Sequence, residues 1–310
     1  MTILTDAGLV VETGKSLHEL YPRLLNEVIH TGRKAAPRHK DTYEISPFIL
    51  VIEDPTDCIV LQKSRRVNHA YGIVEKLSLI SGKADPKTFC FYIPALQTLL
   101  NEEGSFGGAY GPRLTGQLTY IYDLLRNDPD SRRAVMTIYS SPRDQQPAND
   151  IPCTISLQFL LREGRLSAIT NMRSNDVYLG LPYDVQQFTF LQRLMAHWLE
   201  VELGKYTHIA GSSHIYKKDL VSVRKVLNNP DDLNGETEPP VDLAYASAVS
   251  QVEAFFAAEE ELRLGRVQEA QNTSTYQTVG PYLRYCLDKI GRFIQKRAAT
   301  TFQLPMIPSH

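Results

Sequence analysis

The chain has 310 residues, enough to bury a sizeable hydrophobic core, and its formal net charge of −2 at pH 7 gives no electrostatic reason to expect a nucleic-acid partner. No apolar run approaches the roughly 18 residues that cross a bilayer, and the N-terminal residues lack the basic-then-apolar pattern of a secretion signal. The four cysteines form no CxxC pair, which is typical of reduced thiols. We therefore expect a cytoplasmic protein without a membrane partner.

Hydrophobic periodicity in the first part of the chain predicts three helices and one strand. Pro22 is expected in the first turn of a helix that ends at Thr31-Gly32. Residues 43–53 alternate as a strand. Residues 67–81 place apolar side chains on one face before Gly82, and residues 114–126 form a similar helix.

The middle of the chain predicts strands at residues 134–139, 154–161 and 166–172, the last two joined by a tight turn at Glu163-Gly164. Pro182 is expected to open a long helix through residue 203. Such a mixture of strands and helices indicates an α/β (α+β) protein.

Beyond residue 227 the chain becomes polar and rich in turn residues, at 228–232 and 235–240. Helical segments are expected at about 243–264 and 282–297, followed by an extended tail at 302–310. Because this loop is too short for a domain boundary, we expect one domain, 1–310, with a C-terminal helical elaboration at about 241–310.

A candidate nucleophile stands in Ile151-Pro152-Cys153. A lone cysteine is usually an inert core residue. Cys153, however, opens a predicted strand, and Arg132-Arg133 upstream could supply the positive charge that lowers a thiol pKa. By pattern alone, those two arginines are more simply a solvated charge pair. The other three cysteines stand outside such a motif and are expected to be structural.

Two further motifs place polar side chains on shared faces. Ser174 and Asp176 alternate, as do His214 and Tyr216, so each pair would share a face of a strand. An Asp shortly before a Gly-Leu-Pro turn is more often a helix or turn cap, and a lone histidine is more often structural. Spacing alone leaves these alternatives open.

In this order, Ile151-Pro152-Cys153, the segment from Arg173 to Asp184, and His214-Ile215-Tyr216 resemble the active site of the thymidylate synthase superfamily. The resemblance runs colinearly over about residues 23–227. It implies a mixed β-sheet flanked by helices and a homodimer formed through the sheet face. Synthases that act on uracil carry Asn at position 184, whereas Asp184 resembles the cytidylate (dCMP/CMP) 5-hydroxymethylase branch.

The resemblance also implies a role for each site residue. Cys153 would add to C6 of the pyrimidine, Glu75 would order water and transfer protons, and Tyr110 would belong to the catalytic set with Asp184. The phosphate would be bound by Arg38, Arg173 and Ser174, with Arg132 and Arg133 donated by a second copy. His214 and Tyr216 would bind the 3′-hydroxyl, and Asp176 the pterin of the folate co-substrate, 5,10-methylenetetrahydrofolate, with no metal.

Residue 184 carries the substrate hypothesis. Uracil offers an N3–H donor and an O4 acceptor, which one Asn amide can satisfy. Cytosine offers an N3 acceptor and an N4 amino donor. The Asp184 carboxyl can accept from N4 and share a proton with N3, and burial favours such a shared proton. Asp184 therefore favours cytosine over uracil.

Departures from the synthase pattern favour water as the terminal nucleophile. Thr154 replaces the usual His, Gly211-Ser212 replaces Gly-Asp, and residues 83–113 lack the tryptophans that shield the one-carbon intermediate. The sequence thus predicts folate-dependent 5-hydroxymethylation of dCMP or CMP. The alternatives are a cytidylate 5-methylase, a uridylate enzyme, which Asp184 disfavours, and a non-catalytic nucleotide-binding dimer.

Overall fold

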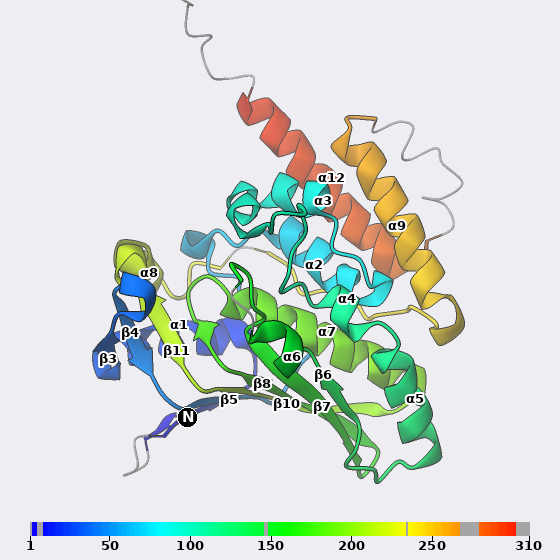
Figure 1. Ribbon diagram of the computed structural model, residues 1–310, viewed down its shortest axis with the longest axis horizontal. Helices are drawn as coiled ribbons and strands as arrows, with labels where there is room; N and C mark the ends of the chain where they lie inside the picture. The colour runs from blue at the N-terminus through cyan, green and yellow to red at the C-terminus, as the bar shows by residue number, and fades with distance from the viewer. Residues whose placement is uncertain (1, 5–8, 146–147, 234, 267–278, 302–310) are drawn as a thin grey trace, which may run out of the picture.

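The computed structural model describes residues 2–4, 9–145, 148–233, 235–266 and 279–301 (Figure 1). Within these residues the centre is a seven-stranded mixed sheet, in the order β1-β2-β5-β10-β8-β7-β6. Its strands are β1 (Thr2–Leu4), β2 (Val10–Gly14), β5 (Phe48–Ile52), β6 (Val135–Thr137), β7 (Thr154–Arg162), β8 (Arg165–Met172) and β10 (Glu202–Ala210). A smaller sheet beside it is formed by β3 (Arg33–Ala35), β4 (Thr42–Ile45), β11 (Ser213–Tyr216) and β9 (Asn175–Asp176), in that order.

Helices stack in layers on one face of the large sheet, as Figure 1 shows. The central helix α7 (Leu181–Leu199) contacts β8 and β10, and α2 (His69–Ser81) packs on α7. The outermost helices, α9 (Ala248–Arg263) and α12 (Pro281–Thr301), pack on α2. The other helices are α1 (Leu17–Thr31), α3 (Pro86–Tyr92), α4 (Gly111–Leu114), α5 (Gln117–Asn127), α6 (Ser141–Asp144) and α8 (Leu220–Asn228).

The opposite face of the large sheet carries half-buried apolar side chains. Side chains alternate along each strand, so Leu50 and His208 point into the core while their neighbours point away. No helix of the described residues lies across this second face (Figure 1). Its side chains include Val11, Ile49, Val51, Leu160, Ile169 and Ile209.

Several predicted elements are confirmed. Helix α2 ends at Gly82, which adopts φ 67° in the left-handed region that glycine tolerates best. The turn between β7 and β8 places Glu163 at φ 51° and Gly164 at φ 73°, as a two-residue hairpin requires. Helix α7 opens around Pro182, and the mixed α/β fold is confirmed.

Other elements differ. Pro22 lies inside α1, which starts five residues earlier with Ser16 as its cap. The ring removes the N–H that would bind the His18 carbonyl, and that carbonyl instead accepts from Gln62 Nε2 at 2.6 Å.

Long predicted elements were also divided. The strand expected at residues 43–53 is β4 and β5, which belong to different sheets and are separated at Ser46-Pro47. Helix α7 ends at Leu199, and residue 203 lies in β10. The tail predicted at 302–310 lies outside the described residues.

A buried ion cluster fastens the helical layers together. Glu238, in the irregular segment after residue 234, pairs with Lys76 of α2 and with Arg193 Nη2 of α7 at 2.5 Å. Tyr282 of α12 donates to the same carboxylate at 3.3 Å. Burial alone would raise the pKa of Glu238, but the charges of Lys76 and Arg193 lower it to about 2.

Replacing Glu238 with Gln should therefore destabilise the protein by about 3–5 kcal/mol, because two buried cations lose their counter-charge. Urea unfolding at pH 7 measures this. The control is Glu236→Gln, whose side chain is 69% exposed and pairs with Lys289, and its cost should be below about 1 kcal/mol.

The pH dependence has a definite sign. Glu238 has a lowered pKa in the folded protein, so its contribution is present above the unfolded value of about 4.3 and is lost as the pH falls towards about 2. The difference in free energy of unfolding between wild type and Glu238→Gln should therefore become smaller as the pH falls from about 4.3 to about 2. Equal stability of the two glutamate variants at pH 7 would contradict a stabilising cluster.

Candidate active site

A cleft of about 870 Å³ lies where β7 begins and β8 ends, beside the small sheet. It brings together six side chains that the sequence singled out from segments far apart: Arg38, Cys153, Arg173, Ser174, His214 and Tyr216. Glu75, Tyr110, Asp176 and Asp184 do not line this cleft, nor do Arg132 and Arg133 of the same chain.

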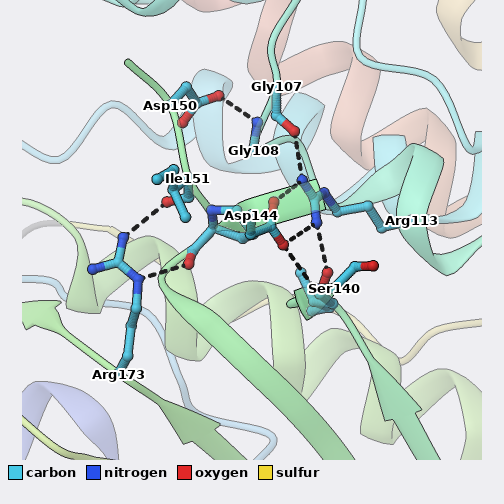
Figure 2. A network of polar contacts seen from close by, with 10 residues as sticks. Gly107, Gly108, Arg113, Ser140, Asp144, Asp150, Ile151 and Arg173 are labelled. Atoms are coloured by element: carbon cyan, nitrogen blue, oxygen red, sulfur yellow. Dashed lines mark hydrogen bonds and ion pairs between the residues drawn. The ribbon is translucent and has the colours of Figure 1, made fainter. Parts of the chain in front are cut away.

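Arg173 holds the loop that carries Cys153 in place (Figure 2). Its Nε donates to the Pro152 carbonyl and its Nη2 to the Ile151 carbonyl, both at 3.0 Å. Its backbone N–H donates to the Cys153 carbonyl at 2.9 Å. Arg173 therefore positions Cys153 and also presents its guanidinium at the cleft.

The electrostatics of Cys153 differ from the expectation. Burial raises the pKa of the Cys153 thiol, Arg173 and Arg38 act to lower it, and Asp184 and Asp150 raise it further. Within one chain, Arg132 and Arg133 are exposed and are not among the groups that act on this thiol, and the cations that lower its pKa are Arg173 and Arg38 instead.

A second network, which the sequence did not reveal, shapes the rim of the cleft (Figure 2). Arg113 makes two 2.7 Å bonds to the Asp144 carboxylate and donates to the Gly107 carbonyl at 2.7 Å. Asp150 accepts from the Gly108 N–H at 2.8 Å. These bonds join the loop at residues 104–111, which contains four glycines, to the segment before Cys153, so this loop has a structural role.

Glu75 projects from α2, and no cation is among the groups that shift its pKa. Tyr71 Oη donates to Glu75 Oε1 at 2.8 Å, while Oε2 is buried with no hydrogen-bond partner in the described residues. Burial raises the pKa of Glu75 to about 7, and the Tyr71 hydroxyl lowers it only in part. A carboxyl group with this pKa can give and take a proton near neutral pH.

Asp184 lies in the first turn of α7 and is held by two amides. Asn175 Nδ2 donates to Oδ2 at 2.7 Å, and Gln187 Nε2 donates to Oδ1 at 3.2 Å. Burial raises the pKa of Asp184 well above its ordinary value, and Glu75 raises it further. A raised pKa favours the protonated carboxyl group, which is the form that the shared-proton argument uses.

Sequence reasoning missed both amides, although each left a signal. Asn175 lies between the two candidate residues Ser174 and Asp176. Gln187 follows Asp184 by three positions, which places both on one side of a helix once the helix is known to begin at Leu181.

Tyr110 connects the first residue of β7 to α7. Its hydroxyl accepts from the Thr154 N–H at 3.3 Å and from Thr154 Oγ1 at 3.1 Å, and its ring stacks on Phe188. Burial raises the pKa of Tyr110 well above its ordinary value, and Asp184 and Cys153 contribute. Thr154, the departure from the synthase pattern, thus has a partner beside the site.

Asp176 adopts the capping geometry that the sequence left open. Its Oδ1 accepts from the N–H groups of Tyr178 at 3.0 Å and Leu179 at 2.8 Å. Burial raises the pKa of Asp176 to about 6, and these N–H groups lower it in part. Ser174 precedes β9 and lines the cleft, so the two side chains do not both face the cleft.

The remaining predicted residues fall into two groups. His214 and Tyr216 share a face of β11 with ring centroids 5.1 Å apart, and both line the cleft. Arg38 lines it from a left-handed backbone position, φ 51°, next to His39 at φ 61°. Arg132 and Arg133 lie in the exposed segment before β6, away from this cleft.

In the parts of the chain that the structure covers, no helix is long and apolar enough to cross a membrane. Within the same residues, no group of three or more His, Cys, Asp or Glu side chains could hold a metal ion.

Comparisons with known proteins agree with this geometry. The family model for thymidylate synthase matches residues 19–263, which extends beyond the predicted 23–227. A deoxyuridylate hydroxymethyltransferase of Bacillus phage SP01 is 31% identical over 225 residues, covering 67% of this chain and 59% of that protein. A thymidylate synthase of Bacillus licheniformis is 34% identical over 155 residues, covering 43% and 55%.

The matched segments thus span little more than half of the length of these relatives. The family match, however, covers most of this chain and includes Glu75, Cys153, Asp184 and His214. The chain belongs to the thymidylate synthase family.

Proposed function

We propose that this protein transfers a one-carbon unit to C5 of a cytosine nucleoside monophosphate and releases the 5-hydroxymethyl product. The observation that carries the proposal is the placement of Cys153 between two kinds of groups. Arg38 and Arg173 act on its thiol as cations, and the carboxyl group of Asp184 acts on it from α7. A nucleotide needs both, because its phosphate is anionic and its base hydrogen-bonds.

The cleft supports a defined orientation for the nucleotide. Arg38, Arg173 and Ser174 would bind the phosphate, since guanidinium groups match phosphate oxygens. His214 and Tyr216 would contact the sugar through its 3′-hydroxyl. The apolar second face of the sheet supports a homodimer, in which the exposed Arg132 and Arg133 would complete the phosphate site of the other copy.

The proposed chemistry uses few groups of this chain. The Cys153 thiolate adds to C6, so that C5 becomes nucleophilic and takes up the one-carbon unit, and the proton on C5 leaves. Loss of that proton would expel tetrahydrofolate and leave an exocyclic methylene group on C5. Glu75 would hold and move the protons and orient the water that adds to this methylene and becomes the hydroxyl group. Elimination of Cys153 restores the aromatic base, and no oxidant or reductant is consumed.

The one-carbon unit would come from 5,10-methylenetetrahydrofolate, which supplies it at the oxidation level of formaldehyde. Two unsatisfied features fit this co-substrate. Glu75 Oε2 is buried without a hydrogen-bond partner in the described residues. Asp176 uses only Oδ1 in the turn, and its raised pKa leaves its carboxyl able to donate to or accept from a pterin ring.

Water as the final nucleophile is supported by how the aromatic residues of the 83–113 segment pack. Phe89 contacts Tyr71 and Phe106, with centroids 5.9 and 5.8 Å apart, and Tyr92 contacts Phe293 at 5.6 Å. These rings are committed to protein contacts, and the segment contains no tryptophan. The alternative 5-methylase would need a shield against water.

A second candidate is hydroxymethylation of dUMP. It is favoured by the phage relative's name and by the raised pKa of Asp184. A protonated carboxyl can donate to O4 and accept from N3–H of uracil, as an amide does. Cytosine still explains the carboxyl better, because only cytosine can take the proton at N3 and leave a charge-assisted pair.

Product analysis tests the proposal. The protein is incubated with methylenetetrahydrofolate and CMP, dCMP, UMP or dUMP, and mass spectrometry identifies the base formed. We expect 5-hydroxymethylcytosine from dCMP. A 5-methyl product would establish the methylase, a uracil product the second candidate, and tight nucleotide binding without any product the non-catalytic dimer.

Asp184→Asn should reverse the preference between bases. The amide cannot share a proton with N3, so kcat/KM for dCMP should fall by roughly two orders of magnitude or more, while exchange at uracil C5 should rise. Asp41→Asn is the control, since that exposed carboxyl pairs with Lys217 at 2.8 Å. An unchanged ratio of dCMP to dUMP activity in Asp184→Asn would show that residue 184 does not read the base.

Mixed dimers test the shared phosphate site. Arg133→Ala and Cys153→Ser should each be inactive, and Cys153→Ser should still bind nucleotide within about tenfold. After random mixing, about a quarter of the wild-type activity should return, because half of the dimers contain one intact site. Mixing Arg133→Ala with Arg132→Ala is the control and should restore nothing. Verified heterodimers without activity would place Arg133 outside the site.

A further inference from the structure

Two buried amides bracket the Asp184 carboxyl from different elements. Asn175 comes from β9 and Gln187 from α7, and each is 2% exposed. Their NH₂ groups lie 2.7 Å from Oδ2 and 3.2 Å from Oδ1. One donor on each oxygen fixes the carboxyl's rotation, so its orientation is set before any nucleotide arrives.

Each amide also carries an oxygen whose hydrogen-bonding capacity is not used. Asn175 Oδ1 and Gln187 Oε1 are buried and have no donor in the described residues. An amide is both donor and acceptor, and rotation by half a turn exchanges the two roles. The same side chain can therefore donate to a carboxylate or accept from a protonated carboxyl.

In the described residues, the other groups that act on Asp184 make no side-chain hydrogen bond to its carboxyl group. Glu75 and Tyr71 face it from α2, Asp176 from β9 and Tyr110 from the start of α4. Tyr206 of β10 and the Cys153 thiol complete the set. None of these groups is cationic. The hydrogen bonds that stabilise the ionised form of Asp184 come from the amides of Asn175 and Gln187.

We propose that Asn175 and Gln187 are positioning residues that support the Asp184 carboxyl in both protonation states while it exchanges a proton with N3 of the pyrimidine. This inference rests on the proposed role of Asp184 in reading the base. A backbone N–H in either place would stabilise only the carboxylate, and an apolar side chain would leave an oxygen unsatisfied. The amide pair avoids both costs during the proton exchange.

The pair should control the pH dependence of nucleotide binding. The carboxyl must be protonated to donate to N3 of cytosine or to O4 of uracil, so affinity is lost as the pH rises through the pKa of Asp184. Removing an NH₂ donor destabilises the carboxylate and raises this pKa further. The alkaline limb of the binding profile, which is the pH range over which nucleotide affinity falls as the pH rises, must then move to higher pH.

The test compares Gln187→Met with Gln192→Met in the full chain. Gln192 is a matched control, because it is also fully buried on α7 but donates to the carbonyls of Leu166 and Gly204 at 2.8 and 3.1 Å. Calorimetry measures dCMP and dUMP affinity from pH 6 to 10. We expect the alkaline limb to move to higher pH in Gln187→Met and not in Gln192→Met. Below this limb, where affinity does not change with pH, Gln187→Met should bind nucleotide several-fold more weakly than wild type.

A double-mutant cycle shows whether the glutamine acts through Asp184. In an Asp184→Asn background the limb should disappear, and adding Gln187→Met should then change the pH profile no further. Asn175→Leu should behave as Gln187→Met does. Gln187→Glu keeps the side-chain size and adds a second acid beside Asp184, so it should also move the alkaline limb to higher pH. This variant provides the test if Gln187→Met does not fold.

An alkaline limb at the same pH in wild type and in both folded Gln187 variants would overturn the inference. Carbon-13 NMR titration of the Asp184 carboxyl in the nucleotide-free protein gives the same midpoint without any ligand, so the result does not depend on which nucleotide binds. If nucleotides bind but dCMP yields no hydroxymethyl product, the proposed function fails while the shift of the limb still decides the role of the amide pair.

Discussion

The close packing of α2 on α7 is the constraint on which the site depends. Gly72 of α2 lies so near α7 that a Cβ atom there would come within 2.3 Å of Gln186 Oε1. Glu238 then ties the two helices together through Lys76 and Arg193. Lys76 is the neighbour of Glu75, so the ion pair that fixes the helix also fixes the direction in which the Glu75 carboxyl projects.

The same cluster explains what the C-terminal helices contribute. Helix α12 supplies Tyr282, whose hydroxyl reaches Glu238 and whose ring lies 5.4 Å from Lys76 Nζ. Helix α9 packs on both α2 and α12. These C-terminal helices therefore support α2, which carries Glu75, and they share the buried core of the chain through residues such as Phe255 and Leu283.

Sequence reasoning succeeded where a local signal decides the structure. The stop of α2 at Gly82, the hairpin at Glu163-Gly164 and the start of α7 near Pro182 each depend on a residue whose backbone preference is intrinsic. It failed where distant groups decide. Pro22 is tolerated inside α1 because Gln62 satisfies the carbonyl that the ring leaves free. The division at Ser46-Pro47 depends on which sheet each half joins.

The same distinction holds for the site. Family resemblance placed six residues in one cleft because their order along the chain is specific. It could not show that Asp176 caps a turn, that Arg38 and Arg173 are the cations acting on Cys153, or that Asn175 and Gln187 hold Asp184. Those facts depend on side-chain directions that spacing does not encode.

The resulting site is electrostatically polarised. Guanidinium groups line the cleft where a phosphate would bind, whereas the carboxyl groups of Glu75, Asp176 and Asp184 have raised pKa values that burial dominates in each case. Raised pKa values favour the uncharged form of these acids, which repels a phosphate dianion less than a carboxylate does but offers it no counter-charge. A nucleotide is thus expected to bind in one direction, with its phosphate at the arginines and its base at the acids. In the proposed function, that direction would place C6 beside Cys153, so the charge separation that orients the substrate would also select the atom that the thiolate attacks.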